Sequence, residues 1–293
     1  MKLKEKNSFT LIELLVVISI IAILSSAVLV YMKPTKENAK LAGELEFRSS
    51  VSGALGAYVT GAWMFEGATI GEAGYDSSGY KNNCIPSSGG NFVYASSAHR
   101  ALGNALSMSG NKWFNCGDSS SRPNLFPTDI TMEAWAKAET LDNNYRGIVT
   151  NKYGNNYGIN LYMHRNNIGS RIGTIQGSSR NNTLVTTTKA PSIGTWYHIV
   201  VTYNSKNRKA VLYVNGKIEK ELTLPGTRIL AYSITNNFFG IGCNYKTNNT
   251  TNCNDRFIGT IDDVKVYDQS LLTFEIKQHY AEGLKKLELA GLK

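Results

Sequence analysis

A single acidic residue, Glu13, lies near the start of an apolar segment that covers residues 8–32. A charge inside hydrocarbon costs about 2.5–3.5 kcal/mol on insertion scales. A segment that serves only as a membrane anchor is therefore expected to lack a carboxylate. The position of Glu13 indicates that this segment has a function beyond anchoring.

The apolar run from Phe9 to Met32 contains 24 residues. As a helix it is about 36 Å long, which is enough to span about 30 Å of hydrocarbon. Lysines 2, 4 and 6 precede it and favour a cytoplasmic amino end, so the bulk of the chain is expected to be exported. An ordinary secretory signal has small residues after its apolar stretch, whereas here the small residue Ser8 precedes it.

This order of basic residues, Ser8, Phe9 and Glu13 closely resembles the prepilin signal and N-terminal helix of type IV pilins and pseudopilins. The resemblance implies that a prepilin peptidase cleaves between Ser8 and Phe9 and methylates the new amine of Phe9. Family members carry glycine where this chain has Ser8, so we expect less efficient cleavage. The resemblance also implies assembly: in a filament, Glu13 would pair with the terminal ammonium of a neighbouring subunit, about one helical turn away, and set the register.

The formal net charge is +9, and removal of residues 1–8 with three lysines and Glu5 leaves +7. This balance permits attraction to anionic surfaces. The basic residues are scattered without a dense run or interleaved aromatics, so no specific nucleic-acid partner is expected. The later two-thirds of the chain is rich in Tyr, Asn, Ser, Thr and Gly, which suits an extracellular β domain with many turns.

All four cysteines lie in the part expected to be exported. An even number in an oxidising compartment predicts two disulfides, with free thiols as the alternative. The spacing favours a Cys243–Cys253 pair, which leaves Cys84 with Cys116. The chain has no Cys-x-x-Cys motif, so zinc and redox sites have little support.

The chain is expected to change from helix to strand near residue 60. Apolar positions recur every three to four residues over 35–58, beyond Pro34, and predict an amphipathic continuation of the first helix. Asn215-Gly216 between two strand-like segments predicts a type I′ hairpin. A last helix is expected over 273–289. Short strands rich in β-branched and aromatic residues are expected at 130–138, 147–152, 158–164, 168–176, 196–203, 209–214, 217–224, 238–242 and 257–267.

Since no helices separate these strands, the expected fold is α+β: a long N-terminal transmembrane helix followed by an antiparallel β-sandwich. Several segments in order, among them residues 130–135, 196–203, 212–216 and 259–267, resemble a concanavalin A-like, laminin G-like jelly roll. The resemblance covers about residues 60–285. The expected organisation is a leader at 1–8, a helix at 9–59 that crosses the membrane over 9–32, a head at 60–285 and a tail at 286–293.

Catalysis is not expected. Glucanases of this shape need two carboxylates about 5–5.5 Å apart, on a strand of the form Glu-x-Asp-x-Glu, which this chain lacks. Asp262 and Asp263 are adjacent and so would point to opposite faces of a strand. The four histidines show no metal spacing, and His198, inside an apolar strand, is expected to be structural.

No cofactor is required by this interpretation, but the resemblance makes Ca²⁺ a candidate, with Asp76 and Asp262 as ligands. Asp262 shares parity with Val264 and is expected to point inward. The alternatives are an Asx turn for Asp76 and hydrogen bonds to backbone amides for Asp262. Trp113, Tyr145, Tyr157 and Tyr245 are candidates to stack on sugars, and Trp63, Trp135 and Trp196 are expected in the core.

The sequence therefore predicts a minor or tip subunit of a type IV pilin-like filament, with a lectin-like head for adhesion to a glycan, protein or surface. Its partners would be the inner membrane, prepilin peptidase and other pilin subunits, and its final location extracellular. Two alternatives remain open at this point. One is a pseudopilin of a type II secretion or DNA-uptake system, and the other is an uncleaved, membrane-anchored surface lectin.

Overall fold

The structure is a computed structural model that describes residues 11–12, 14–21, 58–65, 73–87, 93–95, 105–108, 112–151, 158–176, 178–224, 229–230, 232, 237–246 and 253–289. The chain divides into two compact units, residues 1–57 and 58–293. In the first unit, residues 11–12 and 14–21 are helical, and their large apolar side chains are exposed, from 77% at Leu11 down to 45% at Val17. Among the described residues, no helix combines the length and apolar character that crossing a membrane requires. Ser8, Phe9, Glu13 and residues 22–57 lie outside the described residues.

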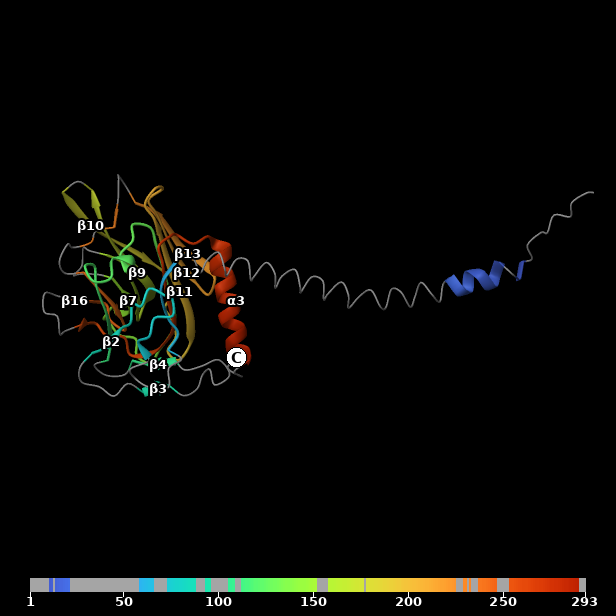
Figure 1. Cartoon of the computed structure of the whole chain (residues 1–293), viewed down its shortest axis with the longest axis horizontal. Helices are drawn as coiled ribbons and strands as arrows, with labels where there is room; N and C mark the ends of the chain where they lie inside the picture. Colours follow the sequence, from blue (N-terminus) through green and yellow to red (C-terminus); the bar gives the residue numbers. More distant parts are fainter. Residues whose placement is uncertain are drawn as a thin grey trace, which may run out of the picture. The chain divides into compact units, whose positions relative to one another are not determined.

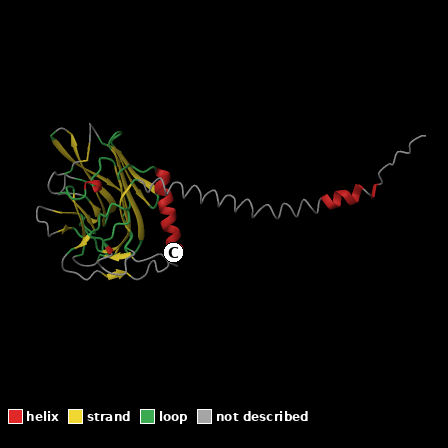
Figure 2. Ribbon diagram, in the orientation of Figure 1, coloured by secondary structure: helices red, strands yellow, loops and turns green. Residues whose placement is uncertain are grey.

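The second unit is a sandwich of two antiparallel sheets, drawn as the two yellow layers in Figure 2. The first sheet has the strand order β13-β12-β11-β6-β18-β4-β3, and β1 also pairs with β18. Its strands are β1 (Val59–Trp63), β3 (Val93–Ala95), β4 (Ala105–Ser107), β6 (Ile130–Ala138), β11 (Trp196–Asn204), β12 (Lys209–Val214), β13 (Lys217–Thr223) and β18 (Gly259–Tyr267).

The second sheet has the order β10-β9-β8-β7-β15-β5-β2, and β14 pairs with β9. Its strands are β2 (Ile85–Pro86), β5 (Phe114–Asp118), β7 (Arg146–Thr150), β8 (Asn160–His164), β9 (Asn167–Gln176), β10 (Ser179–Thr186), β14 (Ile229–Leu230) and β15 (Phe238–Ile241). A short ribbon of β16 (Tyr245–Lys246) and β17 (Cys253–Asn254) and a 3-10 turn, η1 (Pro123–Leu125), complete the β unit.

The core lies between the two sheets, because the strands turn alternate side chains inward. Ile199 and Leu212 come from the first sheet, and Leu161 from the second, and all three are fully buried. Trp63 stacks on Phe239 across the core, with ring centroids 5.2 Å apart. As predicted, the fold is an antiparallel sandwich with its own apolar core.

The C-terminal helix α3 (Thr273–Leu289) covers the outer face of the first sheet, beside β11, β12 and β13 in Figure 1. The contact is close at Gly283, where a Cβ would lie 2.5 Å from the Trp135 ring. Trp135 also stacks on Tyr280, 5.8 Å away. Trp135 is therefore buried, as expected, but under the helix rather than between the sheets.

The predicted orientation of Asp262 is wrong because β18 contains a bulge. The register of β18 against β6 shifts between Asp262 and Lys265, and Asp263 has a φ of 47°. An extra residue in a strand reverses the alternation beyond it. Ile261 and Val264 both enter the core, whereas Asp262 pairs with Trp135 and lies on the helix-covered face.

Candidate functional site

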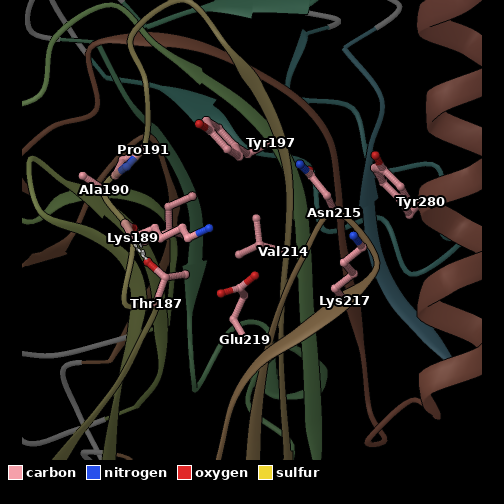
Figure 3. A pocket seen from close by; sticks show the side chains of 11 residues that line it. Thr187, Lys189, Ala190, Pro191, Tyr197, Val214, Asn215, Lys217, Glu219 and Tyr280 are labelled. Atoms are coloured by element: carbon pink, nitrogen blue, oxygen red, sulfur yellow. Dashed lines mark hydrogen bonds between the residues drawn. The ribbon is translucent and has the colours of Figure 1, made fainter.

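A pocket of about 380 Å³ opens at the edge of the sandwich where β13 approaches β10 (Figure 3). It lies between the loop after β10 and the hairpin that joins β12 to β13. Its volume and mixed lining are typical of small-ligand sites. The lining residues are Ile168, Thr187, Lys189, Ala190, Pro191, Tyr197, Val214, Asn215, Lys217, Glu219 and Tyr280.

Two hydrogen-bonded residues hold the loop that forms one wall of this pocket. Thr187 Oγ1 accepts from the Ile168 amide at 3.0 Å and donates to the Lys189 carbonyl at 2.7 Å. Tyr197 Oη accepts from the Ser192 amide at 2.9 Å. The loop is thus fixed on both sides of Ala190, which positions the Lys189 side chain at the rim.

The opposite wall is the β12–β13 hairpin. Asn215 and Gly216 have φ values of 51° and 70°, the left-handed pair that the predicted type I′ turn requires. Asn215 Oδ1 accepts from the His198 amide at 3.0 Å and ties the turn to β11. Beyond the turn, the register of β13 shifts around Glu219, because Tyr213 pairs with Ile218 and Leu212 with Lys220. A bulge of this kind re-aims a side chain, here into the pocket.

The pocket combines an apolar floor with a charged rim. Ile168 and Val214 are buried at its base, while Lys189, Lys217 and Glu219 are exposed around it. Figure 3 shows Lys189 and Lys217 on either side of Val214, with the Glu219 carboxylate between them in this view. Within the described part of the chain, none of these three side chains takes part in an ion pair. Their charges are available to a ligand.

Tyr280 brings α3 into the pocket wall. Its ring stacks on Trp135 and on His198, with centroids 5.8 Å and 5.9 Å apart. A Cβ on Gly216 would lie 2.9 Å from the same ring. The docking of α3 therefore sets one side of the pocket.

Beneath α3 lies a buried ionisable cluster centred on Glu133, whose side chain is 2% exposed. Its Oε1 lies 3.1 Å from His198 Nε2, and its Oε2 lies 2.8 Å from His279 Nδ1. Burial raises the pKa of Glu133, but the charge of His279 and the hydrogen bonds from both histidines outweigh it, and the pKa falls well below its usual value. Burial lowers the pKa of His279, yet the Glu133 carboxylate reverses this and leaves that pKa raised.

Lys265 and Tyr267 of β18 complete this cluster. Burial lowers the pKa of Lys265, but Asp263, Glu133, Glu282 and Asp262 outweigh it, so the pKa is raised. Burial and the Glu133 charge raise the pKa of the Tyr267 hydroxyl. The cluster clamps α3 to the sheet, and His198 has the structural role that the sequence predicts.

Asp76 is buried and accepts four hydrogen bonds. Its Oδ1 accepts from the amides of Ala62 and Ser78, and its Oδ2 from the Ser78 hydroxyl and the Asn82 amide, all at 2.8–2.9 Å. These donors occupy both oxygens, so the arrangement fits the Asx-turn alternative better than a calcium ligand. Asp262 Oδ1 accepts from the Asp263 amide. Among the described residues, no three potential metal ligands converge. Calcium binding stays a prediction.

Both predicted disulfides are present, Cys84–Cys116 and Cys243–Cys253. Of the aromatic residues considered for sugar stacking, Trp113 is instead buried against Phe238. Tyr145 packs on Tyr162 and His164 and lies under the Arg171 guanidinium. Trp196 is half-buried rather than in the core. Tyr157 and the side chain of Tyr245 lie outside the described residues.

Models of two known families match two different parts of the chain. A model of the concanavalin A-like lectin/glucanases superfamily matches residues 109–277, which is more than half of the chain. The chain belongs to this superfamily. A second model, of the prokaryotic N-terminal methylation motif, matches residues 3–29. The fusion predicted from the sequence, a type IV pilin signal joined to a laminin G-like domain, is thereby confirmed. No curated protein matches the sequence.

Several solved structures have the same β-sandwich fold as this chain. Domain 4 of AbnA, a GH43 extracellular arabinanase from Geobacillus stearothermophilus solved with arabinotriose, is 18% identical with a TM-score of 0.53, over 75% of this chain and 97% of that domain. The receptor-binding domain of botulinum neurotoxin D is 15% identical with a TM-score of 0.55, over 78% and 54%. The binding domain of Paraclostridial Mosquitocidal Protein 1 is 17% identical with a TM-score of 0.55, over 78% and 53%. This chain spans about half the length of the two toxin domains. At these identities the likeness shows the fold.

Sequence reasoning did not single out the pocket residues. Lys189, Lys217 and Tyr280 are distant from one another in sequence, and together with Tyr197 and Glu219 they match no catalytic or metal-binding pattern. One signal was available: the Asn215-Gly216 turn places alternating lysine and glutamate residues directly after it, on a strand with little apolar content.

Proposed function

We propose that this chain is a subunit of a type IV pilus-like filament that displays its sandwich for adhesion to a glycan. The observation that carries the proposal is the N-terminal methylation motif over residues 3–29 on the same chain as a lectin-superfamily head. The described helix of the first unit supports it, since its apolar side chains are exposed and need a membrane or neighbouring helices to bury them.

Assembly depends on two charges near the mature amino end. Cleavage after Ser8 gives Phe9 an ammonium group, and methylation leaves that charge in place. In lipid the ammonium of one subunit and Glu13 of the next are each unfavourable alone and favourable together. Before assembly, subunits would lie in the cytoplasmic membrane with the head outside. They would then be incorporated into an extracellular filament.

A glutamate substitution tests the assembly role. Glu13→Val removes the acceptor for the ammonium, so we expect it to abolish incorporation into purified filaments while the protein remains in the membrane. Glu5→Gln is the matched control, because the same kind of charge is lost from the leader that cleavage removes. Normal incorporation of Glu13→Val contradicts the pairing.

Mass spectrometry of the amino terminus separates this proposal from an uncleaved surface lectin. A methylated Phe9 is the expected terminus, and an intact Met1 contradicts processing. Immunogold labelling of filaments then places the subunit. A head of about 230 residues is bulky for a subunit repeated along the whole filament, so we expect label at tips or at sparse positions.

The proposed role of the head is binding rather than catalysis. Among the described residues that line the pocket, Glu219 is the one carboxylate, whereas glycoside hydrolysis in its usual form needs two that flank the scissile bond. An apolar floor with tyrosine and amide groups around it suits a sugar ring, which has apolar C–H faces and hydroxyl edges. Binding of the full-length protein to a glycan array tests this role.

A further inference from the structure

The charges at the rim of the pocket point to the class of sugar. Of the lining residues that the structure describes, the two lysines, Lys189 and Lys217, outnumber the single carboxylate of Glu219 and give the rim a net positive charge. Neither ammonium group is neutralised by an ion pair within the residues that the structure describes. Hydrogen bonds between an ammonium and a carboxylate are roughly twice as strong as those between neutral groups. An anionic ligand therefore gains more from this rim than a neutral one.

The two lysines belong to different elements, and each element holds the backbone of its lysine at the pocket. Lys189 lies in the loop held by Thr187 Oγ1, and Lys217 directly follows the Asn215-Gly216 turn. They lie on either side of the buried Val214 side chain in Figure 3. A group that rests on Val214 can reach an ammonium at its edge while its apolar face contacts the floor. This combination suits a ring that carries an acidic substituent, and suits an isolated small anion less well.

The remaining lining groups match the hydroxyls of such a ring. The Glu219 carboxylate accepts hydrogen bonds from hydroxyl groups, and it also disfavours a ligand whose every edge is anionic. The rings of Tyr197 and Tyr280 add apolar surface at the walls. A sugar with one carboxylate and several free hydroxyls satisfies the whole set.

We infer that this pocket selects acidic sugars, namely hexuronic acid residues of a polysaccharide, through Lys189 and Lys217. The inference rests on the proposed glycan-binding role of the head. It adds a charge requirement that neither the fold nor the superfamily supplies.

The test uses the full-length protein in detergent micelles and two matched probes, trigalacturonate and its methyl ester. Both have the same sugar skeleton, and only the first is charged. We expect trigalacturonate to bind about tenfold more tightly at low salt, which is the effect of one charge-assisted hydrogen bond. Raising the salt concentration is expected to remove most of this preference, because the lysines are exposed.

Substitutions then assign the preference to the pocket. Lys189→Gln and Lys217→Gln are each expected to bring the affinity for trigalacturonate close to that for the ester. Lys206→Gln is the control, since Lys206 is an exposed lysine of the β11–β12 turn outside the pocket. It removes the same charge and should keep the preference. Because all three lysines are exposed, unchanged melting of the variants is expected and verifies folding.

The outcomes separate the inference from the proposed function. Equal binding of the two probes, or an acidic preference that survives both pocket substitutions or is lost in Lys206→Gln, overturns the charge requirement and leaves glycan binding intact. Failure to bind either probe, together with an empty glycan array, overturns both. A preference that depends on Lys189 and Lys217 alone supports the inference.

Discussion

At the scale of single residues, the buried Glu133 carboxylate stabilises the head through its contacts with His198 and His279. Removal of one member of a buried ion pair leaves its partner uncompensated and costs about 3–5 kcal/mol. We expect Glu133→Gln to lower the free energy of unfolding by this amount near pH 6. Glu221→Gln is the control, since its 2.7 Å ion pair with Lys209 is about 44% exposed on the glutamate side and should contribute about 0–1 kcal/mol.

The ion pair between Glu133 and His279 also predicts that the stability of the head depends on pH. The pKa of His279 is raised in the folded state, so its contribution is complete below its ordinary value of 6.5 and is lost as the pH rises through the folded pKa. The pKa of Glu133 is lowered, so its contribution is complete above its ordinary value of 4.5 and is lost as the pH falls through the folded pKa. Urea unfolding should therefore show the largest difference between wild type and Glu133→Gln between these two values. A difference independent of pH from 5 to 9 contradicts the coupling.

Asp76 provides a second prediction at this scale. Asp76→Ala leaves buried amides of Ala62 and Asn82 without their acceptor, so we expect a loss of about 3–5 kcal/mol in urea unfolding. Asn207→Ala removes an exposed Asx turn, in which the side chain accepts from the Lys209 amide, and should cost about 1 kcal/mol or less. Calorimetry of the wild type with Ca²⁺ and then EDTA tests the metal alternative directly. Equal effects of the two substitutions contradict the buried role of Asp76.

At the scale of elements, the sequence predicted nine strands, among them the long strands β6, β11 and β18 at the centre of the first sheet. β6, β12 and α3 begin and end at the predicted residues, and the Asn215-Gly216 turn is confirmed. β10 was missed because most of its side chains are exposed, so it lacks an apolar alternation. β5 was missed because Phe114–Asp118 includes a glycine and an aspartate. The bulges in β13 and β18 have no marker in the sequence, which explains the error at Asp262 and the absence of Glu219 from the predicted site.

Two glycines allow a test of how α3 shapes the pocket. Gly216 and Gly194 both have left-handed φ values, 70° and 75°. Alanine at either position should cost about 1–2 kcal/mol for the backbone conformation alone. A Cβ on Gly194 meets no atom within 4 Å, whereas one on Gly216 lies 2.9 Å from the Tyr280 ring.

We therefore expect Gly216→Ala to displace Tyr280 and weaken glycan binding, in addition to its effect on stability. Gly194→Ala should lower stability by a similar backbone cost and leave binding unchanged. Titration calorimetry of both variants with the same ligand measures the difference. If the two variants bind equally well, the contact between Tyr280 and the hairpin does not position the pocket wall.

At the scale of the whole molecule, the sequence predicted two modules with different partners. The N-terminal segment is apolar and preceded by basic residues, whereas the rest of the chain is polar, rich in glycine and contains the four cysteines. This difference in composition separates the helix from the sandwich, even when the pairing of the strands is not known. The pocket was beyond such reasoning, because Lys189, Glu219 and Tyr280 meet only through the pairing of strands and the docking of α3.

The same scale yields a prediction about where the head begins. β1 starts at Val59 and pairs with β18, and the fully buried Trp63 stacks on Phe239. A fragment of residues 58–293 retains these contacts and loses the exposed apolar helix. We expect it to be soluble without detergent, to unfold in one transition and to bind glycan like the full chain.

A fragment of residues 66–293 is the matched control, because only eight further residues are absent. It loses β1 and Trp63, and it leaves the Asp76 carboxylate without the Ala62 amide. Deletion of a buried tryptophan side chain alone costs about 3–5 kcal/mol, so this fragment should unfold at a much lower urea concentration or fail to fold. Equal urea midpoints for the two fragments would show that β1 belongs with the helix rather than the head. The boundary between filament module and display module would then lie after Phe65 instead of before Val59.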